Sequence, residues 1–335
     1  MEHAAKAARV GNLTQERART LVSEILERTT DFSESIRSET VETFFESHLK
    51  TLGETVSDAT RARYQGVMSK FLEHLDARSK RVLNGVLPKD VQAYATRRAK
   101  EVQASTVKGD LKCLCAVFGD AMKLGHLDKN PVRGIKLPKD QPHERTTFNE
   151  AEIRALFTEA DGDWKTAVLC GYYLGARLGD VVALRWADVD LGMSGAGTVA
   201  FRQSKTGKRL VLPLAIELRE HLESIAADQT EEHIMPTLAT RSPGGRDGLS
   251  AKFMQLLRRA GIDPQYVESK GKPFARLSFH SLRHSFNSVL ANAGVSQEVR
   301  MKLTGHKTVA MNSNYTHHEL TTLSNAVAKL PRLSV

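Results

Sequence analysis

With 335 residues, the chain is long enough to form two domains that each bury a hydrophobic core. Hydrophobic residues make up 41% and charged residues 26%, which is typical of a globular protein, and no apolar run is long enough to cross a bilayer. The net charge of +9 favours a polyanionic partner.

The chain starts without the apolar segment of a secretory leader, and its three cysteines cannot form an even set of disulfides. Cys113 and Cys115 are too close together for a CxxC redox or zinc motif. We therefore expect a cytoplasmic protein with structural cysteines and no membrane contact.

The positive charge is concentrated in the middle of the chain. Residues 51–140 hold 17 basic and 10 acidic side chains, whereas residues 1–50 hold 7 basic and 9 acidic ones. We expect the middle segment to make the main electrostatic contact, although solvated helical surfaces carry a similar excess.

The first forty residues predict a small helical extension. Asn12 can cap a helix, and an apolar stripe follows at helical spacing, formed by Leu21, Val22, Ile25 and Leu26. We expect this helix to dock on its own domain or on a neighbouring protomer, and the alternative is a mobile tail.

Residues 41–139 predict a domain of four or five helices. One helix spans about 57–75, a second starts at Pro88, and a third runs from about 105 to 124 and ends at Gly125. Proline and lysine are frequent from 131 to 142, and we expect residues 140–146 to link this domain to the next.

The second predicted domain spans 147–335 and opens with a helix capped by Asn149. Gly175 and Ala176 allow close packing before Arg177, and Asp180 follows Arg177 at helical spacing. Two β-rich runs between 198 and 214 predict a hairpin whose basic tip contains Lys205. After a helix at about 216–227, we expect only helices and one loose loop.

A stretch from His280 to Tyr315 combines groups that suit phosphate chemistry. His280 and Arg283 are three residues apart and share one face of a helix, and His306 lies in a Gly-His turn before Tyr315. Arginine can clamp a phosphate, histidine can move protons, and tyrosine can attack phosphorus.

A metal site is the competing interpretation, since His280 and His284 are four residues apart. The sequence HSLRH lacks the glutamate of HExxH, and Arg283 would place positive charge beside a cation. No phosphate-binding loop of the GxxxxGK[ST] type occurs either. We expect neither a metal nor another cofactor.

The motifs HSLRH, TGHK and NYTH resemble those of the tyrosine recombinase family, the lambda-integrase-like site-specific recombinases. In that family an arginine after a helix end, a lysine in a hairpin, His-x-x-Arg on one helix and Gly-His precede a nucleophilic tyrosine. The matching residues here are Arg177, Lys205, His280, Arg283, His306 and Tyr315, with Asp180 as the supporting acidic residue. Thr304 departs from the pattern, because the family often has leucine before Gly-His.

The resemblance implies a mainly α chain with a small antiparallel β-sheet. A helical, SAM-like core-binding domain and an α+β catalytic domain would form a C-shaped clamp around DNA. The candidate phosphate contacts in the first domain are Arg61, Arg63, Arg97, Arg98, Lys108 and Lys112.

The resemblance also implies a mechanism. Tyr315 would attack a DNA phosphodiester and form a 3′-phosphotyrosine, while Arg177 and Arg283 hold the phosphate. Lys205 would protonate the leaving 5′-oxygen, His280 would accept the tyrosine proton and His306 would donate a hydrogen bond to the phosphate. Asp180 would orient Arg177 or His280, and His284 would support the helix.

The implied assembly is a homotetramer that joins two duplexes at their recombination sites through a Holliday junction. The tail carries an apolar stripe at Leu320, Leu323, Val327 and Leu330, which predicts a helix exchanged between protomers. Accessory proteins that bend DNA or set direction are candidate partners.

Three alternatives remain open at this stage. A type IB topoisomerase-like enzyme would use the same chemistry to relax DNA, and a non-catalytic DNA-binding relative would retain only the fold. A metal-dependent nuclease would differ from both in its sensitivity to chelators.

Overall fold

The computed structural model describes residues 20, 22, 24, 39–136, 144–192, 197–226, 231–242, 244, 247–270 and 272–317. Most of the extension expected before residue 40 and the tail helix expected after residue 318 lie outside these ranges. Contacts divide the chain into two compact units, 1–142 and 143–335, and each is described by itself. Within the described ranges, no helix has both the length and the apolar character needed to span a bilayer.

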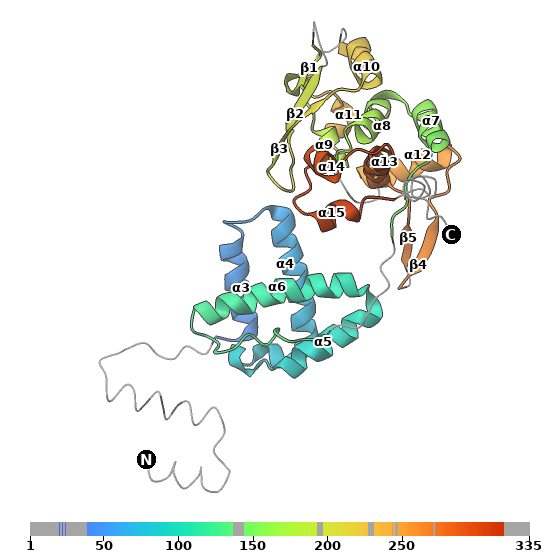
Figure 1. Ribbon diagram of the computed structural model, residues 1–335. Coiled ribbons are helices and arrows are strands. Elements are labelled where there is room, and N and C mark those ends of the chain that lie inside the picture. Colours follow the sequence, from blue (N-terminus) through green and yellow to red (C-terminus); the bar gives the residue numbers. More distant parts are fainter. Residues whose placement is uncertain are drawn as a thin grey trace, which may run out of the picture. The chain divides into compact units, whose positions relative to one another are not determined.

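Unit 1 is entirely helical in its described part (Figure 1). Its α-helices are α3 (Val41–Leu52), α4 (Asp58–Leu75), α5 (Pro88–Glu101) and α6 (Ala104–Lys123), with short 3-10 turns at Asp76–Lys80 and Leu83–Gly85. The side chain of Ser57 caps α4, Pro88 is the first residue of α5, and Gly125 follows α6 in the left-handed conformation.

The core of unit 1 is built from aromatic rings on the four helices. Phe71 of α4 meets Tyr94 of α5 with ring centroids 5.2 Å apart, and Phe118 of α6 at 6.0 Å, both edge-on. Phe45 of α3 meets Phe118 at 5.8 Å. All four rings are almost fully buried, so they fix how the helices pack.

Unit 2 is an α+β domain (Figure 1). Its α-helices are α7 (Glu150–Glu159), α8 (Gly162–Tyr173), α9 (Leu178–Val182), α10 (Ile216–Ala226), α11 (Pro236–Ala239), α12 (Leu249–Arg259), α13 (Phe279–Asn292), α14 (Gln297–Thr304) and α15 (Val309–Ser313), and a 3-10 turn spans Trp186–Asp188. Its strands are β1 (Val189–Asp190), β2 (Thr198–Arg202), β3 (Arg209–Pro213), β4 (Tyr266–Ser269) and β5 (Lys272–Ala275). The prediction of a mainly helical chain with a small antiparallel sheet is confirmed.

The first sheet has the order β1-β2-β3 and is antiparallel throughout. Val199 pairs with Leu212 and Phe201 with Leu210, and all four side chains are buried. Residues 203–208 form the tip of the β2–β3 hairpin, which confirms the hairpin expected around Lys205.

The expectation that only helices and a loop follow α10 is wrong, because β4 and β5 form a second antiparallel hairpin. Tyr266 pairs with Ala275 and Ser269 with Lys272. The strands are short and partly polar, so they lack the alternating apolar pattern that marks a strand in sequence.

Helices α8 and α13 pack against each other at the centre of unit 2. A Cβ atom on Gly171 would lie 2.7 Å from the ring of Phe279 and 2.8 Å from Leu282, so only glycine permits this approach. Gly175, with φ of 56°, lies equally close to Phe286. The close packing expected at Gly175 is confirmed, and it leads directly into Arg177.

Candidate active site

Tyr315 follows α15 and contacts His280 in the first turn of α13. Its hydroxyl oxygen is 2.7 Å from Nε2 of His280. A neutral imidazole that carries its proton on Nδ1 has a lone pair on Nε2, so His280 can accept the phenol hydrogen in this geometry.

The ring of Tyr315 is enclosed by further cationic or imidazole side chains. His284 stacks on it with centroids 4.3 Å apart and planes at 22°, and the His306 ring is 4.6 Å away. Cζ of Arg283 lies 5.6 Å from the ring centre. His284 thus supports the tyrosine ring directly, in addition to its place in the helix.

Arg283 is held in a fixed orientation by backbone carbonyls. Its side chain is 1% exposed, and its two terminal nitrogens each donate at 2.6 Å, one to the carbonyl of Gly175 and the other to that of Thr304. Burial, followed by the charge of Arg177, lowers the pKa of Arg283 to about 10, so it remains a cation at neutral pH.

Arg177 is linked to the β2–β3 hairpin through Asp180. Nη1 of Arg177 lies 3.6 Å from Oδ2 of Asp180, and Oδ1 of Asp180 accepts hydrogen bonds from the backbone and hydroxyl of Ser204 at 2.8 and 2.7 Å. Lys205, the next residue, is exposed and makes no ion pair within the described part of the chain. Gln203 anchors the other side of the tip by donating to the carbonyl of Thr304 at 3.1 Å.

Several buried nitrogens of the candidate site have no hydrogen-bond partner among the described residues, including Nη1 of Arg177, Nε of Arg283, Nδ1 of His284 and Nε2 of His306. Buried polar groups are normally paired, so this concentration of unpaired donors is unusual. The arrangement suits an anion with several oxygen atoms, such as a phosphodiester.

The three histidines near Tyr315 are neutral at physiological pH. Burial first, then the charges of His284, Arg283, Arg145 and Arg177, lowers the pKa of His280 to about 3. Burial is also the main cause for His306, whose pKa falls to about 3, and for His284, whose pKa falls to about 4. A neutral His280 can act as a proton acceptor.

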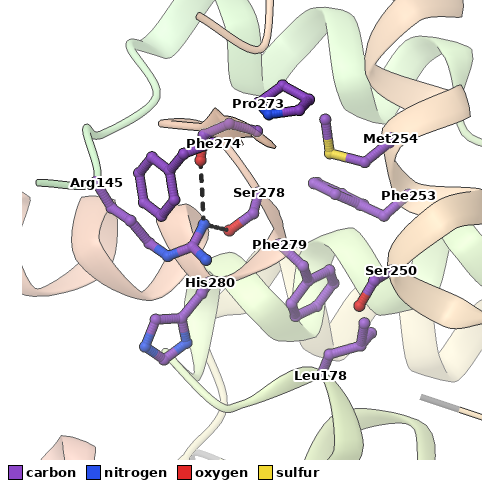
Figure 2. A pocket seen from close by; sticks show the side chains of 11 residues that line it. Arg145, Leu178, Ser250, Phe253, Met254, Pro273, Phe274, Ser278, Phe279 and His280 are labelled. Carbon is purple, nitrogen blue, oxygen red and sulfur yellow. Dashed lines mark hydrogen bonds between the residues drawn. The ribbon is translucent and has the colours of Figure 1, made fainter. Parts of the chain in front are cut away.

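Arg145 is a charged neighbour that the sequence did not reveal. Its guanidinium donates to the hydroxyl of Ser278, lies 5.3 Å from the ring of Phe274 and points toward His280 (Figure 2). It borders a cavity of about 370 Å³ between α12, α13 and the β4–β5 hairpin. The partners of Arg145 are more than one hundred residues away in sequence, so no local spacing could identify it.

In unit 2, Tyr315 contacts His280, Arg283 and His306, and Asp180 joins Arg177 to the β2–β3 hairpin. Lys205 lies on the tip of that hairpin and contacts none of these side chains in the described structure. Arg283 and Gln203 both donate to the carbonyl of Thr304, which joins the hairpin tip to the Tyr315 side of the site. Among the described residues, Asp180 contacts Arg177 and the hairpin but no histidine ring, which favours Arg177 over His280 as the side chain that it would orient.

The six candidate phosphate contacts of unit 1 differ in their surroundings. Arg98 is 11% exposed and pairs with Asp110 and Glu101, and Arg97 pairs with Glu73 and Glu101. The exposed side chains without an ion pair in the described structure are Arg61, Arg63, Lys108 and Lys112. Structural ion pairs therefore account for Arg97 and Arg98, and the other four remain candidates.

Residues 39–136 and 144–317 contain no group of three His, Cys, Asp or Glu side chains that could hold a metal ion, within their described parts. A chelator experiment addresses the metal dependence of the reaction itself.

Comparison with known proteins matches residues 146–321 to the phage integrase family and residues 40–137 to the phage integrase SAM-like domain. The chain is 26% identical over 289 residues to tyrosine recombinase XerC of Roseiflexus sp., covering 82% of this chain and 88% of that protein. It is 25% identical over 243 residues to the integrase of Enterobacteria phage 434, covering 70% of this chain and 64% of that protein.

Solved structures show the same fold. A lambda integrase dimer bound to a COC′ core site has a TM-score of 0.67 and 20% identity, covering 100% of this chain and 90% of that chain. A lambda integrase tetramer bound to a Holliday junction has a TM-score of 0.65 and 20% identity, covering 90% of this chain and 87% of that chain.

Proposed function

The chain belongs to the phage integrase family and is a site-specific tyrosine recombinase, and we propose how its residues carry out DNA cleavage and rejoining. The observation that carries this proposal is the 2.7 Å contact between the Tyr315 hydroxyl and Nε2 of His280. Near that contact, Arg177, Arg283 and His306 each have a buried nitrogen without a hydrogen-bond partner among the described residues, and these nitrogens can bind a phosphate.

In the proposed cleavage step, the phenol oxygen of Tyr315 attacks the phosphorus atom and its proton passes to His280. The bond between phosphorus and the 5′-oxygen breaks, and Lys205 donates a proton to that oxygen. The products are a 3′-phosphotyrosine and a free 5′-hydroxyl. Attack by a 5′-hydroxyl on the phosphotyrosine reverses the chemistry, so rejoining requires no ATP.

The two arginines stabilise the negative charge that develops on phosphorus oxygens during this step. Arg283 is positioned by two backbone carbonyls before DNA arrives, and Arg177 by Asp180. Such fixed cations need no reorganisation at the moment of reaction. The bound phosphate raises the pKa of the nearby histidines, which favours proton transfer to His280.

The partner is double-stranded DNA, and the chain acts as an oligomer on it. We propose a homotetramer on two recombination sites that passes through a Holliday junction, with the two domains, 41–139 and 147–335, clamping the duplex. The same proposal includes exchange of the tail helix between protomers and the action of accessory DNA-bending or directionality proteins. It also includes a cytoplasmic location. Solved lambda integrase assemblies on a core site and on a Holliday junction support the DNA-bound oligomer.

The alternatives are not favoured. The chain is similar to recombinases and integrases along both domains, which argues against a topoisomerase-like relaxing enzyme. A relative that only binds DNA would not need a phenol in hydrogen-bond contact with an imidazole beside two arginines.

The test is covalent trapping on a nicked duplex carrying a recombination site. Wild-type protein is expected to form a covalent adduct in the presence of a chelator, and Tyr315→Phe is expected to form none while binding DNA normally. Tyr266→Phe, which changes an exposed tyrosine on β4, is the matched control and retains the adduct. An adduct formed by Tyr315→Phe would disprove the nucleophile assignment.

A further inference from the structure

Helices α13, α14 and α15 enclose a buried polar network beside His306. Asn287 and Asn312 are completely buried, as is Thr304, and Arg300 is 6% exposed. Burying polar groups costs free energy unless each of them has a hydrogen-bond partner. In such a network the neighbours of each group therefore determine whether it donates or accepts a hydrogen bond.

Arg300 determines the orientation of the Asn312 amide. Nη1 of Arg300 lies 3.3 Å from the amide oxygen of Asn312, and a guanidinium can only donate. The oxygen of Asn312 must therefore face Arg300, and its nitrogen faces the opposite side. There the nitrogen donates to the amide oxygen of Asn287 at 3.1 Å and lies 3.1 Å from Nδ1 of His306.

The amide nitrogen of Asn312 has two hydrogens and no lone pair to offer, so Nδ1 of His306 must be the acceptor in this contact. The hydroxyl of Thr304 lies 3.0 Å from the same Nδ1 and 2.7 Å from the carbonyl of Arg300. If this hydroxyl donates to Nδ1, it supports an unprotonated Nδ1, and if it donates to the carbonyl, the Asn312 amide is the only donor that Nδ1 receives from these two groups.

A neutral imidazole with a free Nδ1 carries its hydrogen on Nε2. Nε2 of His306 is the buried nitrogen that has no partner among the described residues. We propose that Asn312 is a positioning residue that fixes His306 in the Nε2–H tautomer, which makes His306 a hydrogen-bond donor toward the scissile phosphate. The donor role toward phosphate rests on the proposed function.

The same network holds the backbone of the nucleophile. The amide of Asn287 donates to the carbonyl of Tyr315 at 3.0 Å and to the hydroxyl of Thr316 at 2.8 Å, and the Tyr315 backbone N–H donates to the carbonyl of Asn312 at 2.9 Å. Asn312 is thus connected both to the histidine that would bind phosphate and to the tyrosine that would attack it.

The test compares three full-length variants. Asn312→Asp keeps the size of the side chain but replaces the donor by an acceptor, which favours a hydrogen on Nδ1 of His306. Asn312→Ala removes the donor without adding charge. Asn314→Ala changes an exposed asparagine two positions along and serves as the matched control.

Two measurements are made on each variant. Imidazole ¹H–¹⁵N correlation spectra of the DNA-free protein report the tautomer of His306, with His306→Gln used to assign its signals. Covalent adduct formation on the nicked duplex reports cleavage.

Wild type and Asn314→Ala are expected to show the Nε2–H tautomer and full cleavage. Asn312→Asp is expected to place hydrogen on Nδ1 and to slow cleavage about 10- to 100-fold, as loss of a supporting hydrogen bond typically does. Asn312→Ala should show a mixture of tautomers and an intermediate rate.

The proposal is overturned if wild-type His306 carries its hydrogen on Nδ1, or if Asn312→Asp leaves the tautomer unchanged. A changed tautomer with an unchanged cleavage rate also overturns it, because the hydrogen on Nε2 would then have no role in the reaction. The spectra report the tautomer even in a protein without activity. Failure of the nucleophile assignment would appear separately, as adduct formation by Tyr315→Phe.

Discussion

Tyr315 lies among side chains whose protonation decides whether they can accept or donate a proton. His280 and His306 are both held neutral by burial, which lowers the pKa of each to about 3. Their surroundings nevertheless differ, because Nε2 of His280 contacts the phenol of Tyr315, whereas the buried Nε2 of His306 has no partner among the described residues. For His306, the partners of Nδ1 therefore decide its role more than its charge does.

The buried His284 makes stability dependent on pH. Its pKa is about 4 in the folded protein, mainly because of burial, and close to 6.5 when the chain is unfolded. The unfolded chain therefore binds more protons between these values, so the free energy of unfolding falls as pH decreases from about 6.5 toward 4, and this contribution is constant above that range.

We expect His284→Phe to flatten this dependence, because phenylalanine can still stack on Tyr315 but takes up no proton. At pH 5 the slope of unfolding free energy against pH should decrease by up to about 1.4 kcal/mol per pH unit. Urea unfolding of both proteins at a series of pH values from 5 to 7.5 measures this slope. Equal slopes in the two proteins would mean that His284 is not held neutral in the folded state.

The residues proposed to react were proposed from sequence alone, because their chemistry and order form a pattern. Arg145 and Asn312 could not be proposed in this way. Arg145 contacts Ser278 across the fold, and an arginine before a helix has no distinguishing local feature. Asn312 gains its role only from the way Arg300 and Asn287 orient its amide, and buried amide networks leave no periodic trace in a sequence.

At the scale of elements, the β2–β3 hairpin is the part that carries a proposed catalytic group on an exposed tip. Asp180 and Thr304 hold its base from two sides, through Ser204 and Gln203. Lys205 itself has no partner in the described structure, so its placement depends on its neighbours. This suggests that anchoring of the hairpin, and not only the lysine, sets the rate of protonation of the leaving group.

We expect Ser204→Ala to slow cleavage about tenfold, because it removes the 2.7 Å hydroxyl bond to the Asp180 carboxylate. A substrate whose 5′-bridging oxygen is replaced by sulfur needs no general acid and should restore the rate, as it should for Lys205→Ala. The measurement is the rate of adduct formation with both substrates.

Ser224→Ala, which removes a hydroxyl that donates to a backbone carbonyl on α10, is the control and should leave both rates unchanged. If sulfur restored Lys205→Ala but not Ser204→Ala, Ser204 would act on phosphate binding through Asp180 and Arg177 instead of on Lys205. If sulfur failed to restore Lys205→Ala, the general-acid role of Lys205 would be wrong.

The elements themselves were predictable to different degrees. Long helices with a capping residue, such as α4 after Ser57 and α7 after Asn149, follow from spacing and capping. The β4–β5 hairpin could not be predicted because its strands have four residues each, and the contact of β5 with Arg145, through the carbonyl of Ala275, comes from a residue 130 positions away in sequence. Strands that depend on such distant contacts carry little local signal.

At the scale of the whole molecule, the basic surplus of residues 51–140 is divided between paired and unpaired side chains. Arg97 and Arg98 are used inside unit 1, whereas Lys108 and Lys112 lie four residues apart on α6 and are both exposed. Their spacing places them on one face of the helix. That face is our candidate for the DNA backbone contact of unit 1.

We expect Lys108→Ala combined with Lys112→Ala to weaken DNA binding and to reduce its salt dependence. Each lysine that neutralises a phosphate releases counterions, so the slope of log Kd against log salt should fall by about 2 for two such contacts. Fluorescence anisotropy with a duplex recombination site at several salt concentrations measures this slope.

Lys123→Ala on the same helix is the matched control. Because Lys123 is paired with Asp120 at 2.6 Å, this variant should leave the slope unchanged. A double variant with the wild-type slope would show that this face of α6 does not contact the phosphates, and the footprint of unit 1 would then have to include the other exposed pair, Arg61 and Arg63 on α4.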